Sequence, residues 1–220
     1  MRVAFFGGTF DPIHRGHLGL ASAAADAFAL DRVLFAPVDR QPLKTEAAVA
    51  PYADRFEMVR LALAPDAQHQ PATGDVRPAT GNIPNPGFAV SALDAPRSDG
   101  TPNYTIDSLT ALAQEIPSAT LFVLTGADSF LDLRRWHSPD RLLALAEWIV
   151  VSRPDFPLSE SQLSPLALAP AQRARVHLLP TVHEEVSATD LRRRLHDGDP
   201  CPGLLSPAVA AYIQSHRLYR

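Results

Sequence analysis

Residues 7–17 (GGTFDPIHRGH) join three glycines, an aspartate and two histidines in one short run. Glycines let backbone N–H groups come close to an anion, and a helix N-terminus adds a favourable dipole. His14 and His17 would add hydrogen-bond donors and, when protonated, positive charge. An apolar run at residues 3–6 precedes the motif, and a helical pattern begins near Leu18. The order of strand, glycine turn and helix start predicts a phosphate-binding site.

This motif differs from the two common phosphate-binding motifs. It contains neither G-x-x-x-x-G-K-S/T, the P-loop pattern, nor G-x-G-x-x-G, the usual dinucleotide fingerprint. Taken alone, His14 and His17 would also fit two metal ligands on one helix face, or an ordinary pair on a helix surface. The glycines that precede them favour phosphate over both alternatives.

A second anion-binding pattern lies at residues 186–192 (VSATDLR). Ser187 followed three residues later by Asp190 is a capping-box pattern, so we expect a helix to begin here. The hydroxyls of Ser187 and Thr189 suit an anion at a helix start, and Arg192 can hold a phosphate with two parallel hydrogen bonds. Alone, the segment is more typical of a capped surface helix with its arginines in solvent. Together with the first motif, phosphate binding is favoured.

Composition limits the classes of protein that remain. The 220 residues are enough for one α/β domain, and 46% of them are hydrophobic. The net charge of −4 gives no basic field for nucleic acid, and no apolar run approaches the ~20 residues that cross a membrane. The single cysteine, Cys201, excludes an internal disulfide and argues against a cysteine-rich zinc site. The first residues already form a strand pattern, so we expect no signal peptide. We expect a cytoplasmic enzyme that binds neither nucleic acid nor membrane.

Lys44 is the only lysine beside 19 arginines. A general preference for arginine would explain the imbalance. Under such a preference, a lysine that remains suggests a position that needs a compact ammonium group. Lys44 is therefore a candidate for binding an anion.

Strand patterns alternate with helical patterns along the chain. We expect strands at residues 3–6, 33–37, 88–93, 121–124, 148–151 and 176–179. We expect helices at residues 18–28, 52–63, 105–116, 189–195 and 207–214, and one that ends at 142–146. The alternation predicts a doubly wound α/β fold with a mainly parallel sheet, in a single domain over residues 1–220. Residues 67–87 are rich in proline and glycine and predict a loop insertion, and residues 155–170 predict a loop with a short helix.

The first motif resembles, over eleven positions, the signature of the nucleotidyltransferase superfamily, whose H-x-G-H histidines bind the phosphates of ATP. Residues 186–192 resemble the second signature of that superfamily, I-S-S-T-x-I-R, with Ala188 where many members have serine. The resemblance implies a Rossmann-like nucleotidyltransferase fold. It also implies an ATP site made of Gly7, Gly8, Thr9, Phe10, His14, Gly16, His17, Ser187, Thr189 and Arg192.

Shorter segments resemble one family within the superfamily, the bacterial nicotinate-nucleotide adenylyltransferases. Residues 102–105 (PNYT) resemble the P-S-Y-T segment of that family, and residues 126–128 (GAD) followed by Trp136 resemble its G-x-D…W block. Residues 151–154 (VSRP) resemble a strand that ends in R-P. The last part of the chain also resembles the family's ending, at residues 204–207, 212–213 and 218–220. The order and spacing of these segments are specific and cover nearly the whole chain.

The resemblance implies adenylyl transfer from ATP to nicotinate mononucleotide, with Mg²⁺ arriving on ATP. It implies catalytic roles for His14, His17, Lys44 and Arg192, with His17 acting in the transition state. Tyr104, Thr105 and Trp136 would frame the pyridine ring, and Asp128 would bind a ribose. The chemistry of these residue types agrees, since tryptophan stacks on flat rings and carboxylates bind ribose hydroxyls. Without the resemblance, Trp136 would equally suit a core aromatic and Asp128 a helix cap.

The sequence departs from the family in two places and leaves alternatives open. One departure is residues 67–87, which are longer than the corresponding connection usually is. The family often has P-P-H-K where this chain has QPLK at residues 41–44, so Leu43 replaces a histidine. Nicotinamide mononucleotide and phosphopantetheine are alternative acceptors, although Tyr104, Thr105 and Trp136 argue against phosphopantetheine. A nucleotide-binding sensor without catalysis is a third alternative, against which the two intact phosphate motifs argue. The sequence makes no prediction of the oligomeric state.

Overall fold

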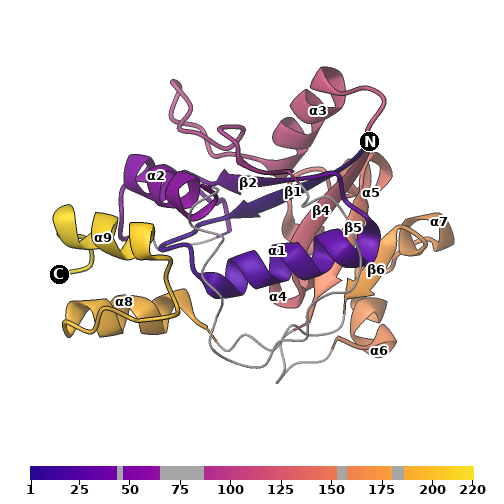
Figure 1. Cartoon of the computed structure of the whole chain (residues 1–220). Helices are drawn as coiled ribbons and strands as arrows, with labels where there is room; N and C mark the ends of the chain where they lie inside the picture. The colour runs from indigo at the N-terminus through magenta and orange to yellow at the C-terminus, as the bar shows by residue number, and fades with distance from the viewer. Residues whose placement is uncertain (44–46, 65–86, 153–157, 180–185) are drawn as a thin grey trace.

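The computed structural model describes residues 1–43, 47–64, 87–152, 158–179 and 186–220. Lys44, residues 153–154 and residues 67–86 of the predicted insertion lie outside these ranges. The strands are β1 (Arg2–Gly8), β2 (Arg32–Pro37), β3 (Gly87–Val90), β4 (Thr120–Gly126), β5 (Glu147–Val151) and β6 (Val176–Leu179). They form one parallel sheet in the order β3-β2-β1-β4-β5-β6 (Figure 1). The prediction of a doubly wound α/β fold is confirmed.

Helices connect the strands and close the chain. They are α1 (Arg15–Phe28), α2 (Tyr52–Ala62), α3 (Thr105–Glu115), α4 (Ala127–Leu131), α5 (Pro139–Leu145), α6 (Glu160–Leu163), α7 (Pro170–Arg173), α8 (Ala188–His196) and α9 (Pro207–Ser215). Short 3₁₀ helices occupy Leu133–Arg135 and Ser164–Leu166. Within the described ranges, no helix has the length and apolar content needed to cross a membrane.

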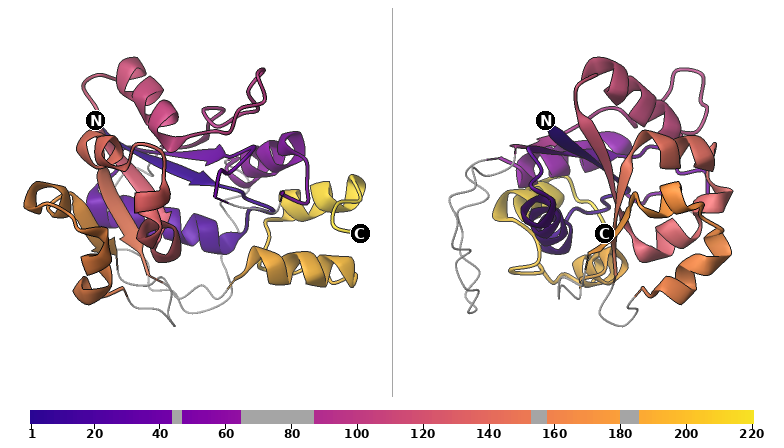
Figure 2. Two further views of the ribbon diagram at one scale, coloured as in Figure 1. Left: turned by 180° about the vertical axis from the view of Figure 1, so that it is seen from behind. Right: turned by 90° about the vertical axis from the view of Figure 1, so that its right-hand side faces the viewer.

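Alternating side chains of the strands build two cores, one on each face of the sheet. In β1, Ala4 and Phe6 belong to one core, and Val3 and Phe5 belong to the other. Helices α1, α2, α8 and α9 cover the first face, and α3, α4, α5 and α6 cover the second. Figure 2 shows these two groups on opposite sides of the sheet. A sheet covered on both faces explains why its strands are nearly continuous apolar runs.

Helices α8 and α9 lie side by side with the C-terminus, at the end of the molecule toward which β1 points (Figures 1 and 2). Their apolar side chains, among them Leu191 and Val209, join the first core. Residues 186–192, the second predicted phosphate-binding pattern, therefore lie at the same edge of the sheet as residues 7–17, the first pattern.

The structure shifts several predicted boundaries. Helix α1 begins at Arg15 and not near Leu18, which places His17 in its first turn. Strand β3 ends at Val90, and it begins at Gly87, the last residue of the predicted insertion. Helix α4 was not predicted, because a helix of 5 residues is too short to show a periodic pattern. Short helices within residues 155–170 agree with the prediction for that segment.

Candidate active site

The strand order reverses at the centre of the sheet, between β1 and β4. Doubly wound sheets bind ligands at such a switch point, outside the carboxyl ends of the strands. A cavity of about 410 Å³ lies there, lined by Gly7 and Gly8 at the end of β1 and by residues 123–125 of β4. Its place and volume suit a small-molecule ligand.

Three residues predicted to bind the acceptor meet at one wall of this cavity. They are Tyr104, Thr105 and Trp136. Thr105 begins α3, and Trp136 follows the 3₁₀ helix at its C-terminal end. Trp136 is half-buried, with its ring edge-on to buried Trp148 at a centroid distance of 5.8 Å. Trp136 therefore borders the cavity while its ring packs against the buried Trp148.

A buried carboxyl, that of Asp94, belongs to the same lining and was not predicted from the sequence. Ser108 of α3 donates a hydrogen bond to Asp94 Oδ1. A side chain built on Gly7 would place its first carbon 3.7 Å from Asp94 Oδ2, so this oxygen lies beside the end of β1. Burial raises the pKa of Asp94 to about 6. Asp94 lies in an irregular segment after β3, where no sequence pattern distinguishes it from a solvent-exposed aspartate.

The chain turns after β1 at Phe10 and not at the glycines. Gly7 and Gly8 are still strand residues, in register with Ala36 and Pro37 of β2. The expected glycine turn was therefore misplaced, and Phe10 takes the left-handed conformation instead, with φ of +48°. A side chain on Gly8 would come within 2.9 Å of the buried Phe10 ring. Gly8 is needed because this ring packs against the strand, which holds the turn in a sparsely populated conformation.

A buried arginine, Arg55 of α2, braces this turn from within. Its guanidinium donates to the carbonyl oxygens of Thr9 at 2.7 Å, Val38 at 2.8 Å and Ala50 at 3.0 Å. A buried guanidinium that donates to three carbonyls ties Thr9, within the first motif, to the backbone at Val38 and Ala50. The helical spacing of α2 predicts its apolar positions only, so Arg55 was missed.

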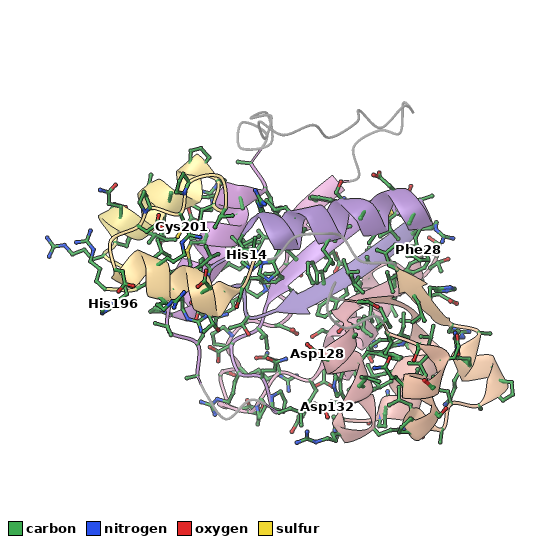
Figure 3. The ribbon with its side chains drawn as sticks, turned by 90° about the horizontal axis from the view of Figure 1, so that it is seen from below. His14, Phe28, Asp128, Asp132, His196 and Cys201 are labelled. Atoms are coloured by element: carbon green, nitrogen blue, oxygen red, sulfur yellow. The ribbon has the colours of Figure 1, made fainter. Side chains whose placement is uncertain are left out.

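The two histidines of the motif lie ring against ring at the start of α1. Their ring centroids are 3.8 Å apart, and His14 N–H donates to His17 Nδ1 at 3.3 Å. Figure 3 shows His14 at the end of α1 nearer α8 and α9, with Phe28 at the opposite end. His14 Nδ1 is buried without a hydrogen-bond partner in the described part of the chain. Such an unsatisfied nitrogen is unusual in a folded protein and suits a ligand group.

Both histidines are neutral at pH 7 in the ligand-free protein. Burial lowers the pKa of His14 to about 4. Burial, and secondarily repulsion from His14 when that ring is protonated, lowers the pKa of His17 well below 6.5. The sequence left open a positive charge on these histidines, but desolvation of the buried imidazoles disfavours their charged forms. The histidines therefore enter the site as neutral hydrogen-bonding groups.

Arg192 joins the two phosphate-binding patterns, which are far apart in the sequence. Its Nη1 atom donates to the backbone oxygen of Asp11 at 2.8 Å, and its Nη2 donates to Thr189 Oγ1 at 3.2 Å. Nη1 also lies 4.0 Å from Asp11 Oδ2. The side chain of Arg192 is 27% exposed, so it is held by the first motif while part of it still reaches solvent.

The start of α8 differs in detail from the predicted capping box. Ser187 occupies the N-cap position, as expected, but its side chain makes no capping hydrogen bond. Asp190 accepts from Arg193 instead of from the backbone at the cap. Ser187 and Thr189 are both exposed at this helix start, where backbone N–H groups lack partners within the helix. The arrangement keeps the hydroxyls accessible to an anion.

Among the residues that the structure describes, the predicted site residues form two neighbouring groups, and one residue, Asp128, lies outside them. One group surrounds the cavity, and the other joins residues 9–17 to Arg192. Asp128 is exposed in the first turn of α4, outside the cavity lining and on the opposite side of the sheet from α1 (Figure 3). Its ribose role stays a prediction. Lys44 lies outside the described residues.

The chain matches the model of the cytidylyltransferase-like family over residues 5–194. The fold and this match define a nucleotidyltransferase. The chain is 38% identical over 220 residues to the probable nicotinate-nucleotide adenylyltransferase of Thermus thermophilus, covering 100% of both chains. It is 38% identical over 219 residues to that of Thermomicrobium roseum, covering 100% of this chain and 92% of the relative. It belongs to the nicotinate-nucleotide adenylyltransferase family.

Solved structures share the fold at lower identity. Plasmodium falciparum nicotinic acid mononucleotide adenylyltransferase complexed with NaAD has a TM-score of 0.72 at 17% identity, covering 99% of this chain and 97% of the other. The same protein complexed with APC has a TM-score of 0.70 at 16% identity, covering 99% and 96%. At such identities the likeness shows the fold alone.

Proposed function

We propose that this enzyme transfers the adenylyl group of ATP to nicotinate mononucleotide, giving nicotinate adenine dinucleotide and pyrophosphate. The observation that carries the proposal is the hydrogen bond from Arg192 to the Asp11 carbonyl. It unites two phosphate-binding patterns beside a cavity that an aromatic wall lines. The names of the relatives support the same reaction. We propose further that residues 1–220 act as one catalytic domain.

In this reaction a phosphate oxygen of the mononucleotide attacks the α-phosphorus of ATP. The bond from that phosphorus to the bridging oxygen breaks, and pyrophosphate leaves. No covalent enzyme intermediate is required, so the protein contributes positioning and stabilisation of charge. His14, His17, Arg192 and the hydroxyls of Ser187 and Thr189 are described groups that would contact the ATP phosphates. Lys44 would add a cation.

The half-buried ring of Trp136 would stack on the pyridine of the acceptor, with Tyr104 and Thr105 at the start of α3 beside it. The carboxylate of nicotinate would accept hydrogen bonds from Arg135 and His137, which neighbour Trp136 in the cavity lining, or from two backbone N–H groups at the start of α3. Leu43, which replaces the usual histidine, also lines the cavity and contributes apolar surface there.

Magnesium would enter as the complex with ATP and neutralise charge on its phosphates. In the described ranges, no three histidine, cysteine, aspartate or glutamate side chains lie close enough to hold a metal ion. The magnesium ion that arrives with ATP would be held mostly by phosphate oxygens and water, as is usual for magnesium.

Pyrophosphate release tests the proposal directly. The enzyme would be mixed with Mg-ATP and either nicotinate mononucleotide, nicotinamide mononucleotide or phosphopantetheine, with Mg-ATP alone as the blank. We expect release with nicotinate mononucleotide and none above the blank with phosphopantetheine. ATP binding without release in every mixture would instead identify a nucleotide sensor.

A further inference from the structure

The penultimate residue of the chain reaches into the phosphate-binding motif. The Tyr219 hydroxyl donates to Asp11 Oδ1 at 2.7 Å, and both side chains are buried. The Asp11 carboxylate also accepts from the backbone N–H groups of Val49 at 2.7 Å and Ala50 at 3.2 Å. One carboxylate thus joins the motif, the segment that follows Lys44 and the C-terminal tail.

Asp11 occupies a central place among the phosphate-binding groups. It follows the strained Phe10, lies three residues before His14, and gives its backbone oxygen to Arg192. The C-terminal part also holds the start of α1, because Arg15 N–H donates to the Leu204 carbonyl at 2.9 Å. A shift of Asp11 would therefore move the histidine turn and Arg192 together.

The tail is held in an unfavourable conformation to make this contact. Arg217 and Tyr219 have φ of +54° and +64°, in the left-handed region that side chains disfavour. Such residues persist only where the surrounding structure compensates for their strain. Here Leu218 N–H donates to the Ile213 carbonyl at 3.1 Å, and the Leu218 side chain packs against the first core. The chain end is thereby fixed with its hydroxyl directed at Asp11.

We propose that Tyr219 is a positioning residue that acts through Asp11 on the H-x-G-H motif and Arg192. The C-terminal tail thereby completes the ATP side of the active site without touching a substrate. This inference rests on the proposed function for its kinetic consequence. Its structural consequence, order in residues 9–17 and 47–52, can be measured without any turnover.

The chain contains a matched control for this contact. Tyr212 of α9 donates to Asp54 Oδ1 of α2 at 2.9 Å. This pair has the same chemistry and also lies near the C-terminus, but it joins α9 to α2 and touches neither motif. Tyr219→Phe and Tyr212→Phe each remove one hydroxyl from a tyrosine–aspartate pair and keep the ring.

The experiment compares the wild-type enzyme with these two variants by hydrogen exchange and by kinetics. We expect Tyr219→Phe to speed amide exchange in residues 9–17 and 47–52 and to lower kcat/KM for ATP about 10-fold, with KM for the acceptor within about twofold. We expect Tyr212→Phe to leave both the exchange of these segments and kcat/KM within about twofold of wild type. Asp11→Asn, which weakens the same contact, should reproduce the exchange and the kinetic loss of Tyr219→Phe.

Equal losses in the two tyrosine variants, or unchanged exchange in Tyr219→Phe, would show that the contact only stabilises the fold. If Tyr219→Phe does not fold, Asp11→Asn decides between the same outcomes. If the wild-type enzyme releases no pyrophosphate, the proposed function fails separately. Exchange and Mg-ATP binding by calorimetry then still decide the role of the tail, with affinity lost in Tyr219→Phe and kept in Tyr212→Phe.

Discussion

The backbone N–H of His14 donates to Nδ1 of His17, over 3.3 Å, at the first turn of α1. Because Nδ1 accepts, a neutral His17 must carry its proton on Nε2. The neighbouring imidazole of His14, with centroids 3.8 Å apart, limits how the ring can rotate. The fold therefore fixes the orientation and the tautomer of His17 before ATP binds. A fixed N–H donor contributes most where charge develops during the reaction.

His17→Ala is expected to lower kcat by ~100-fold or more, while the Kd for ATP changes much less. The reason is that a preoriented donor to the phosphates stabilises the transition state more than the bound substrate. Steady-state kinetics and calorimetry with Mg-ATP measure the two effects. His196→Ala, an exposed histidine on α8, is the control and should behave as wild type. A kcat for His17→Ala within about threefold of wild type would remove His17 from the mechanism.

His14 makes the free energy of unfolding depend on pH. Its pKa is about 4 in the folded protein, against 6.5 ordinarily, because it is buried. Between these values the unfolded chain binds a proton that the folded protein does not, so stability falls as pH drops from 6.5 to 4. The full loss is about 3 kcal/mol. Urea unfolding measures the free energy of unfolding of His14→Gln and of wild type. The value for the variant relative to wild type should rise by about 3 kcal/mol as the pH falls from 6.5 to 4. A constant difference between variant and wild type would mean that His14 protonates freely.

Asp94 makes the free energy of unfolding depend on pH in the opposite direction. Burial raises its pKa from 3.8 to about 6, so between these values the folded protein keeps a proton that the unfolded chain has lost. The folded state is penalised as pH rises through this window, by about 3 kcal/mol once Asp94 is ionised. Asp94→Asn keeps an oxygen for Ser108 and avoids the penalty. Its stability relative to wild type should rise between pH 4 and pH 7, and the exposed-site control Asp26→Asn should show no comparable slope.

The fold was predictable because the strands are buried on both faces. Runs such as residues 3–6 and 148–151 are almost wholly apolar, and only helical patterns separate them. Boundaries were less predictable because local sequence does not determine them. Helix α1 begins at Arg15 because the Leu204 carbonyl, 189 residues away in the chain, accepts its N–H. The turn falls at Phe10 because its ring packs on Gly8 and on the core.

The candidate site was predictable where its residues occur in short motifs. Residues 7–17, Trp136 and Arg192 have recognisable spacing, and the structure brings the first and last together. Asp11 was visible within the motif, but its partners lie at residues 49–50 and 219, which no local pattern connects. Asp94 and Arg55 were missed for a related reason. Charged residues are ordinarily exposed, and only tertiary structure shows that these two are buried.

Lys44→Ala is expected to raise KM for ATP or to lower kcat, because an ammonium group beside phosphates contributes to binding. Lys44→Arg keeps the charge but offers a planar fork in place of a compact ammonium, so it should restore only part of the loss. Initial rates at varied ATP and acceptor concentrations measure both variants. Unchanged KM for both substrates together with unchanged kcat in Lys44→Ala would make Lys44 a solvated surface residue.

The cavity wall that carries Tyr104, Thr105 and Trp136 suggests how the enzyme distinguishes nicotinate mononucleotide from nicotinamide mononucleotide. Arg135 and His137 flank Trp136, and all three line the cavity, with the His137 ring 4.5 Å from that of Tyr104. Hydrogen bonds to a charged group are about twice as strong as neutral ones. Donors placed for a carboxylate are poorly matched by a neutral amide, whereas stacking on Trp136 does not distinguish the two.

The enzyme is therefore expected to prefer nicotinate mononucleotide to nicotinamide mononucleotide by roughly 10- to 1,000-fold in kcat/KM, the effect of one or two charge-assisted hydrogen bonds. Trp136→Ala should lower kcat/KM for both acceptors and leave their ratio nearly unchanged, because it removes the stacking surface only. Arg135→Gln should reduce the ratio if that guanidinium meets the carboxylate. Pyrophosphate release with each acceptor over a range of concentrations gives all these values. Equal values for the two acceptors in the wild-type enzyme, or a preference for the amide, would overturn the acceptor assignment and leave adenylyl transfer standing.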